Sequence, residues 1–572
     1  MKWVFTYLKP LWSRITVGIS IKTVGTLAEL MIPYLLSHIL ENVIVTNDIN
    51  RIAFCGGLMA VCAVIACLGN IIANRMAAKT TMLFATRMRR ELFSKTLHLS
   101  ARSTDSFTIP SLESRITSDT YNVQNFIGMI QRMGIRAPIL LLGGTAITLV
   151  LDWKLALVMI ATMPLIFVVV YSVSRKGVPL YTKVQQSVDG MVRVVREDAQ
   201  GIRVIKALSK INYENARYDR ANLELKKNET KAGIIMGIAN PVMTLLMNTG
   251  IVAVVAVSAH FVARDQSSTT SVLAFMQYFT LISMAMMALS RMFVMYTKCA
   301  ASAKRIYQVM EQENELKLCP DDGKGDTSLH ISFENVSFSY LGKKNNLSDI
   351  TFSLKRGQTL GIIGATGSGK STILRLLMRF YDVDSGVIRI NGKDVRSYTP
   401  EELTAMFGVV FQNDFLYADS IEENIRFGRE ISRENIVEAT KIAQAYDFIS
   451  SFSDALDYRV SAGGTNLSGG QRQRVLISRA IAGSPEILVL DDSSSALDYK
   501  TDANLRRALS VALPHSTIIT VAQRVSSVKN CDLILVIENG VIIGSGKHEE
   551  LMGNCAAYKE ISDSQMGGAF LD

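Results

Sequence analysis

Residues 359–380 read TLGIIGATGSGKSTILRLLMRF, in which a short apolar run, a glycine-rich turn and a leucine-rich segment follow one another directly. The turn fits the pattern G-x-x-x-x-G-K-[S/T], and its flanks predict that it lies between a β-strand and an α-helix. A purely structural glycine turn is disfavoured by the complete match. The sequence therefore predicts a nucleotide-binding loop, in which backbone N–H groups close around phosphate oxygens. Its residues are Gly364, Ala365, Thr366, Gly367, Ser368, Gly369, Lys370, Ser371 and Thr372.

The expected cofactors are ATP and Mg²⁺. Lys370 is expected to neutralise the β and γ phosphates, and the Ser371 hydroxyl to ligate Mg²⁺. Further along the chain, residues 486–492 read EILVLDD, an apolar strand that ends in acidic residues. In this arrangement Asp491 would hold Mg²⁺ through water.

Length and composition indicate that part of the chain lies in lipid. The chain has 572 residues, too many for one domain, and its 48% hydrophobic residues and mean hydropathy of +0.22 exceed those of ordinary soluble enzymes. The seven cysteines are scattered without a C-x-x-C pair, so we expect them to be reduced and structural. The net charge of +10 could suggest nucleic acid. The basic residues cluster beside apolar segments, however, so no nucleic-acid partner is expected.

Six apolar segments are long enough to span a bilayer. We place them at about 14–42, 52–79, 125–151, 154–174, 232–262 and 270–298. The aromatic and basic residues 1–12 predict a short helix at the membrane surface before the first span. That span is much longer than the apolar core of a signal peptide and has no cleavage site, so we expect it to be retained.

The distribution of charge predicts the orientation. Two long polar stretches, about 80–124 and 175–231, separate the spans, and the second carries thirteen Lys and Arg residues. The positive-inside rule places these stretches, both termini and the phosphate loop in the cytoplasm of a multi-pass cell-membrane protein. Apolar residues recur at helical spacing in the polar stretches, so we expect the helices to continue well beyond the bilayer.

Glu29 lies near the middle of the first span, where a carboxylate facing lipid would be costly. It is expected to face a cavity or a partner. One interpretation is a site for a cationic substrate, and the other is a structural hydrogen bond or a packing partner for Lys22. The fifth and sixth spans are rich in methionine, which suits a surface that accepts varied apolar ligands but equally suits ordinary packing.

The composition turns polar after Tyr307. We expect a membrane domain over residues 1–310, a linker over 311–328 with proline and glycine punctuation, and a second domain over 329–572. The second domain alternates strand-like and helix-like segments, as in an α/β nucleotide-binding fold.

A further motif makes the resemblance to a known family specific. The segment LSGGQRQRVLISRAI begins with Leu467, Ser468, Gly469, Gly470 and Gln471. These five residues resemble the signature sequence of the ATP-binding cassette (ABC) family. Together with the phosphate loop they make a resemblance to that family that covers the whole chain. The resemblance implies that Tyr340 stacks on adenine. It also implies that Gln412 contacts Mg²⁺ and the membrane domain. Six spans followed by one cassette are similar to the type IV exporter half-transporter.

In that family two halves pair, and each ATP lies between the phosphate loop of one cassette and the signature of the other. The resemblance implies contact helices near residues 111–118 and 212–219, the second reaching the partner's cassette. Gly469 and Gly470 permit close backbone approach, and the helix that begins there directs its positive end at the γ-phosphate.

The chain departs from the family pattern at the base and the switch. Asp492 stands where efficient members carry a glutamate base, so its carboxylate would retreat by roughly 1 Å from the attacking water. Gln523 replaces the switch histidine, and Ala462 stands where a glutamate is often seen. A degenerate base and switch beside an intact signature resemble one chain of a heterodimeric exporter. Chance drift in a homodimer is the alternative.

The expected function is ATP-driven export of amphipathic, drug-like compounds from a bacterial cytoplasm, as one half of a heterodimer. A lipid flippase or peptide exporter is the alternative within the class. From another class, the chain could be an ATP-gated membrane regulator without turnover. ATP-dependent uptake into inverted vesicles separates these two classes.

Overall fold

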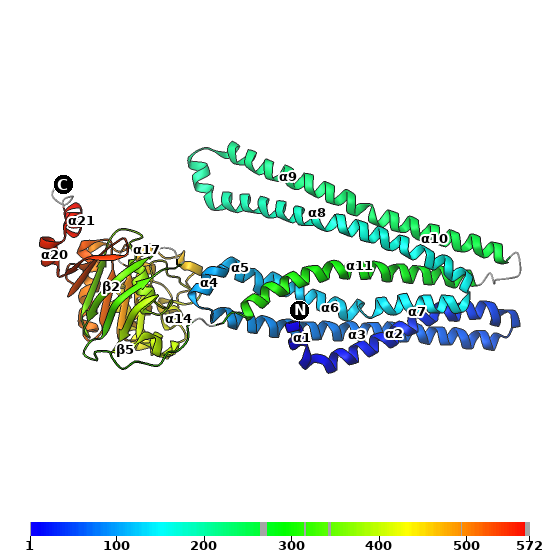
Figure 1. Ribbon diagram of the computed structural model, residues 1–572, viewed down its shortest axis with the longest axis horizontal. Helices are drawn as coiled ribbons and strands as arrows, with labels where there is room; N and C mark the ends of the chain where they lie inside the picture. The colour runs from blue at the N-terminus through cyan, green and yellow to red at the C-terminus, as the bar shows by residue number, and fades with distance from the viewer. Residues whose placement is uncertain are drawn as a thin grey trace. The chain divides into compact units, whose positions relative to one another are not determined.

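The computed structural model describes residues 2–262, 271–313, 316–340, 342, 345–493 and 495–566, which form two compact units. Unit 1 comprises residues 1–98 and 107–312, and unit 2 comprises residues 99–106 and 313–572. Unit 1 is entirely helical and unit 2 is an α/β fold, so the predicted fold class is confirmed (Figure 1).

Unit 1 is built from long helices whose starts are capped where the sequence allows it. Asp48 and Asp152 each accept hydrogen bonds from the backbone N–H groups of the second and third residues of the helix that follows. The helices are α1 (Lys2–Leu8), α2 (Trp12–His38), α3 (Ile49–Leu97), α5 (Ile109–Ser114), α6 (Thr120–Met133), α7 (Arg136–Leu151), α8 (Trp153–Ala207), α9 (Ile211–Gly237), α10 (Ala239–Val262) and α11 (Ser271–Met310).

Within the described residues, six helical stretches are long and apolar enough to cross a membrane. They are Trp3–Val43, Ile49–Leu97, Ile109–Leu151, Trp153–Ala207, Ile211–His260 and Val272–Met310. Four of them contain a predicted span in full, Ile211–His260 covers 232–262 except its last two residues, and Val272–Met310 covers 270–298 except its first two, of which residue 270 lies outside the described residues. The chain is therefore a multi-pass membrane protein. Helices α8 and α9 run side by side as a long hairpin, and α9 packs chiefly on α8 (Figure 1).

The predicted interpretations of Glu29 need one correction. The guanidinium of Arg136 donates two hydrogen bonds to the Glu29 carboxylate, at 2.6 and 3.2 Å. Lys22 is not its partner, because the Lys22 ammonium donates instead to the side-chain oxygens of Asn70 and Asn74, at 2.7 and 3.1 Å. A carboxylate inside the membrane is thus neutralised by an arginine on the neighbouring helix, α7.

Unit 2 contains two sheets with helices packed against them. In the six-stranded sheet, ordered β10-β9-β3-β8-β7-β6, all neighbouring strands are parallel except the antiparallel pair β10 and β9; the four-stranded sheet, ordered β2-β1-β4-β5, is antiparallel. The strands are β1 (Ile331–Phe338), β2 (Leu347–Leu354), β3 (Thr359–Ile363), β4 (Ser385–Ile390), β5 (Lys393–Asp394), β6 (Phe407–Val410), β7 (Ile487–Asp491), β8 (Thr517–Val521), β9 (Leu533–Glu538) and β10 (Val541–Gly546).

The helices of unit 2 are short, and several begin at a serine, threonine or aspartate cap. They are α4 (Ala101–Phe107), of which Phe107 belongs to unit 1, α12 (Lys370–Leu377), α13 (Pro400–Ala405), α14 (Ile421–Arg426), α15 (Arg433–Ile442), α16 (Tyr446–Ser450), α17 (Gly469–Ile481), α18 (Tyr499–Ala512), α19 (Val525–Val528), α20 (His548–Asn554) and α21 (Ala556–Met566).

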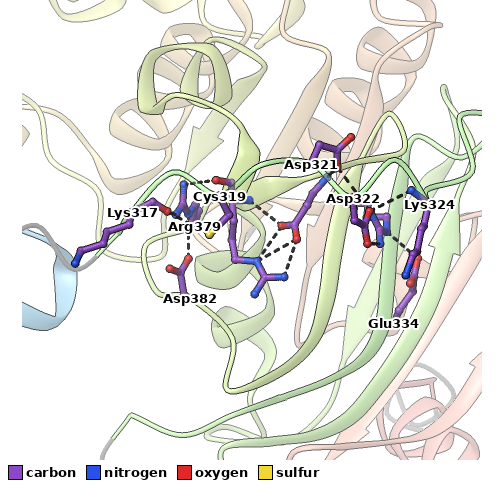
Figure 2. A network of polar contacts seen from close by, with 11 residues as sticks. Lys317, Cys319, Asp321, Asp322, Lys324, Glu334, Arg379 and Asp382 are labelled. Atoms are coloured by element: carbon purple, nitrogen blue, oxygen red, sulfur yellow. Dashed lines mark hydrogen bonds and ion pairs between the residues drawn. The ribbon is translucent and has the colours of Figure 1, made fainter.

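The segment that enters unit 2 is held by arginines of the sheet region (Figure 2). Arg379 donates to the Lys317 carbonyl at 2.6 Å and to the Asp382 carboxylate at 3.0 Å. Arg389, which is only 4% exposed, donates to both carboxylate oxygens of Asp322 at 2.7 and 2.8 Å. These bonds hold the pKa of Asp322 well below its usual range. The later part of the predicted linker is therefore fixed along unit 2.

The first predicted contact segment, near residues 111–118, is misplaced. Those residues form α5 and a following turn inside unit 1. The residues that pack within unit 2 lie earlier, at 99–106, where Ala101 packs on the core and the Tyr381 hydroxyl donates to the Asp105 carboxylate at 2.6 Å. Residues 212–219, the second predicted segment, lie in the first turns of α9.

Candidate functional site

The sheet topology explains why the candidate site residues meet. Strands β3, β8 and β7 are neighbours and parallel, so their carboxyl ends share one edge of the sheet. The glycine loop leaves β3, Asp491 ends β7, and Gln523 follows β8. Ligands of open parallel sheets bind at this edge.

The phosphate loop is already closed into a cradle. The Lys370 ammonium donates to the carbonyls of Gly364 and Ala365 at 2.8 and 2.7 Å, which holds the side chain across the loop. A Cβ at Gly364 would overlap the Ile537 carbonyl oxygen. At Gly369 φ is +107° and a Cβ would lie 2.7 Å from Leu347, so this backbone path requires glycine. Burial lowers the pKa of Lys370, and the Asp491 and Asp492 carboxylates oppose that shift.

A cavity of about 290 Å³ lies over this loop. Its walls include most of the residues predicted for nucleotide and Mg²⁺. Those lining it are Tyr340, Thr366, Gly367, Gly369, Lys370, Ser371, Thr372, Gln412, Asp491, Asp492 and Gln523. Asn346 and Arg375 also line it and were not predicted. Arg375 could have been found from its spacing, because it lies four residues after Ser371 and so on the same face of α12.

Three oxygen donors of the cavity suit Mg²⁺. The Asp491 carboxylate is buried and accepts a hydrogen bond from the Ser371 hydroxyl, and the Gln412 side chain lines the same space. Burial raises the pKa of Asp491. A bound cation would offset that cost, because Mg²⁺ prefers carboxylate, hydroxyl and carbonyl oxygens. These residues fit the predicted ion.

Asp492 and Gln523 are joined by a hydrogen bond beside the three oxygen donors, and we call this pair of residues the corner. The Gln523 side-chain amide donates to the Asp492 carboxylate at 3.2 Å. Asp492 has φ of +50°, a conformation that aspartate tolerates better than most residues. Burial raises the pKa of Asp492, which by itself would suit a general base. Two other features make Asp492 a poorer base. Its side chain is shorter than that of glutamate, so the carboxylate lies farther from the attacking water, and one of its oxygens already accepts a hydrogen bond from Gln523.

The C-terminal helix α21 fixes the segment that follows Gln523. The Gln565 amide donates to the Gln523 carbonyl at 2.8 Å, and its oxygen accepts from the Val525 N–H at 2.8 Å. A second cavity of about 560 Å³, lined by Asp492, Gln523 and Gln565 among others, lies on this side of the corner. No local motif could have indicated Gln565, because it lies 42 residues from Gln523 in the sequence.

Tyr340 closes another side of the nucleotide cavity. Its hydroxyl bonds to the Thr372 hydroxyl at 3.3 Å and accepts from Arg375 at 3.3 Å. Its ring meets those of Phe338 and Tyr381 edge-on, at 4.9 and 5.1 Å between centroids. These contacts leave an aromatic group fixed at the cavity, as stacking on a nucleobase requires.

The signature residues are placed apart from this cavity. None of Leu467, Ser468, Gly469, Gly470 or Gln471 is among the described residues that line it. Ser468 caps α17, and Ser468 and Gln471 exchange backbone-to-side-chain hydrogen bonds of 2.9 and 3.3 Å. A Cβ at Gly469 would meet only Ala496, at 3.8 Å. Helix α17 therefore presents its N-terminus without a ligand partner in its own cassette.

Comparisons with known proteins agree with this geometry. The sequence pattern described as "ABC transporter transmembrane region" matches residues 15–286, and the pattern described as "ABC transporter" matches residues 347–495. The chain is 32% identical over 571 residues to the uncharacterized ABC transporter ATP-binding protein YfiB of Bacillus subtilis, which covers 99% of both chains. It is 28% identical to the putative ABC transporter ATP-binding protein exp8 of Streptococcus pneumoniae, over 99% of this chain and 97% of the relative.

One solved structure shares the complete fold. It is described as a bacterial Atm1-family ABC exporter with ATP bound, and it matches with a TM-score of 0.83 over 98% of this chain and 99% of that one. The two sequences are 22% identical, so the likeness concerns the fold alone.

Proposed function

We propose, from the premise that the chain belongs to the ABC transporter family and couples ATP hydrolysis to transport, that it is one half of a heterodimeric exporter. In this proposal the pair moves amphipathic, drug-like compounds out of a bacterial cytoplasm. The phosphate loop and the cassette would lie on the cytoplasmic side, as the basic polar stretches predict.

The proposed roles follow the chemistry of each side chain. Lys370 and the loop N–H groups bind the phosphates, Tyr340 stacks on the base, and Ser371, Gln412 and Asp491 hold Mg²⁺. ATP with Mg²⁺ supplies the phosphoanhydride bond whose hydrolysis drives transport. Asp492 occupies the position of the base, and Gln523 that of the switch.

The heterodimer proposal rests on one observation. Asp492 and Gln523 depart from the family pattern, whereas the signature in the same unit matches it. The Gln523 amide donates to the Asp492 carboxylate, and the Asp492 side chain is shorter than that of the usual glutamate. The capping box of α17 is complete. Ser468 and Gly469 are not among the described residues that line the nucleotide cavity of their own cassette, which supports their completing a site on a partner.

Unit 1 supports the pairing as well. The α8–α9 hairpin exposes large apolar side chains, including Val204, Tyr213 and Leu223. Exposed apolar surface of this kind is typical of protein interfaces. A second half-transporter would cover it.

The test is transport by the pair. The chain is co-expressed with a candidate partner half-transporter, and ATP-dependent uptake of a fluorescent amphipathic dye is measured in inverted vesicles. We expect uptake that stops when ATP is replaced by a non-hydrolysable analogue. The chain expressed alone is the matched control. Equal ATP hydrolysis and dye transport by the chain alone would contradict the heterodimer. Opening of the membrane domain by ATP without hydrolysis and without dye uptake would contradict export.

A further inference from the structure

A cavity of about 480 Å³ lies in unit 1 where residues of α2, α10 and α11 meet. Most of its wall is aliphatic or thioether, from side chains such as those of Ile32, Ile251, Met276 and Met284. Methionine side chains are flexible and polarizable, so a wall of this kind adapts to apolar ligands of different shapes. A cavity of this size holds one drug-sized ligand or part of one.

Three polar side chains interrupt this wall, those of Glu29, Gln277 and Thr280. The Thr280 hydroxyl donates to the Met276 carbonyl at 3.0 Å, so its oxygen can accept from a ligand. The Gln277 amide forms no hydrogen bond to another described residue, so it can both donate to a ligand and accept from one. The wall thus offers hydrogen bonds beside apolar surface, as the binding of an amphiphile requires.

The electric charge of the wall is set by an ion pair. Glu29 is the only charged residue among the described residues that line the cavity. Both of its carboxylate oxygens accept hydrogen bonds from the Arg136 guanidinium of α7, at 2.6 and 3.2 Å. The side chains of Glu29 and Arg136 are 20% and 29% exposed, so water screens the pair only in part. The wall therefore carries no net charge at its one ionisable position.

A neutral wall disfavours ions of either sign. An ion that leaves water for an apolar cavity loses hydration free energy, and only a counter-charge in the wall can offset that loss. A cation would have to displace the Arg136 guanidinium, whose planar fork already matches the Glu29 carboxylate. An anion would instead meet that carboxylate in the wall. An uncharged amphiphile meets neither obstacle.

We propose that Glu29 and Arg136 are specificity-determining residues, and that their pairing restricts this cavity to uncharged amphiphiles. The apolar body of the ligand lies among the isoleucine and methionine side chains, and its hydroxyl or amide group bonds to Gln277 and Thr280. The inference deepens the proposed export function and rests on it for one point, the identification of the ligand as the transported compound. The charge selectivity of the cavity is independent of export.

The test compares three ligands that share one body. Binding of pyrenebutanol, pyrenebutanoate and pyrenebutylammonium to the full-length chain in phosphatidylcholine nanodiscs is followed by pyrene fluorescence, and each affinity is referred to the ligand concentration in the lipid. Since only the head group differs, we expect the alcohol to bind about tenfold more tightly than either ion. An ammonium ligand that binds as tightly as the alcohol would overturn the proposal.

Removing one partner of the pair should change the selectivity in opposite directions. Glu29→Gln leaves the Arg136 guanidinium without its carboxylate, so affinity for pyrenebutanoate should rise by about tenfold and affinity for the ammonium should fall. Arg136→Gln leaves the Glu29 carboxylate uncompensated in the wall, so affinity for the ammonium should rise by about tenfold instead. The double variant has neither charge and should again prefer the alcohol. Unchanged selectivity in both single variants would show that the pair serves only packing, and would overturn the proposal.

The direction of the change separates charge from folding. A poorly folded variant binds all three ligands weakly, whereas each single variant is expected to gain affinity for one ion and lose it for the other. Glu224→Gln makes the same substitution at an exposed position of α9 outside the cavity, and should change each affinity by less than about twofold. If an unpaired charge prevents both single variants from folding, the double variant still decides, because a preference for either ion there would overturn the proposal.

Transport separates this inference from the export proposal. ATP-dependent uptake of pyrenebutanol into inverted vesicles that contain the pair, with a shift toward pyrenebutanoate in Glu29→Gln, would identify the cavity as the site of the exported compound. The expected binding pattern without any uptake would support the selectivity of the cavity and contradict export. Equal uptake of all three ligands, unchanged in either single variant, would support export and overturn the selectivity.

Discussion

Two regions of the nucleotide-binding unit, the start of helix α17 and the pair formed by Asp492 and Gln523, differ in how fully they keep the family pattern. Helix α17 begins with a full capping box at Ser468 and presents Gly469, whose surroundings would admit a Cβ. The corner formed by Asp492 and Gln523 is instead closed on itself, by the bond between the two side chains and by Gln565 behind them. Under the proposed pairing, the region that would receive a partner's nucleotide is open, and the region that would move a proton is restrained.

This difference indicates how two functions can be divided between two chains. Binding needs the loop, Lys370 and an oxygen set for Mg²⁺, all of which are in place here. Hydrolysis additionally needs a base at the correct distance from water. Under the proposed heterodimer, the site made by this loop would hold ATP as a structural element of the dimer, while the site completed by its signature would carry most of the turnover.

The largest effect is expected from Gly469→Glu. The substitution is tolerated within the chain, because a Cβ there meets only Ala496 at 3.8 Å. In the pair, the new carboxylate would lie against the partner's nucleotide and repel its phosphates. ATPase activity of the purified pair should fall on the order of 100-fold. Retained melting temperature serves as the folding control, and full activity of the variant would remove the signature from the competent site.

A smaller effect is expected from Lys370→Ala. The variant loses the ammonium that spans the loop between the Gly364 and Ala365 carbonyls. Nucleotide binding at this chain's loop should weaken by about tenfold or more, measured with a fluorescent ATP analogue. Transport should fall less than after the equivalent change in the partner. If both changes abolish transport equally, the two sites are not functionally different.

Gln565 offers a test of the restraint at the corner. Gln565→Ala removes two hydrogen bonds to the Gln523–Val525 segment, which should lower stability by about 1 kcal/mol and lower the melting temperature. Gln565→Glu can still accept from the Val525 N–H but cannot donate to the Gln523 carbonyl, so it should give an intermediate result. If Gln565→Ala instead melts like the unmodified protein, this contact does not restrain the segment.

Much of the fold and the binding site could be predicted because their signals are local. The phosphate loop, the acidic end of β7 and the signature each lie in one short stretch of sequence, and each membrane span is a continuous apolar segment. The shared edge of β3, β7 and β8 then brings most of these residues together.

The features that could not be predicted depend on pairs far apart in the chain. Glu29 meets Arg136 and Tyr381 meets Asp105 only because segments that are distant in sequence pack together. Lys22 was a plausible partner for Glu29 by proximity in sequence, but Asn70 and Asn74 of α3 bind it instead. Gln565 likewise meets Gln523 and Val525 only through tertiary packing.

The smallest expected effect is also the most direct test of the division between the two sites. Asp492→Asn removes the only carboxylate at the base position and leaves the length of the side chain and its bonding capacity similar. If the partner's site supplies the turnover, the purified pair should keep more than about half of its steady-state ATPase activity, a change of less than about 0.5 kcal/mol in activation free energy. Complete loss of ATP hydrolysis in Asp492→Asn would show that Asp492 is a working base and would contradict the account.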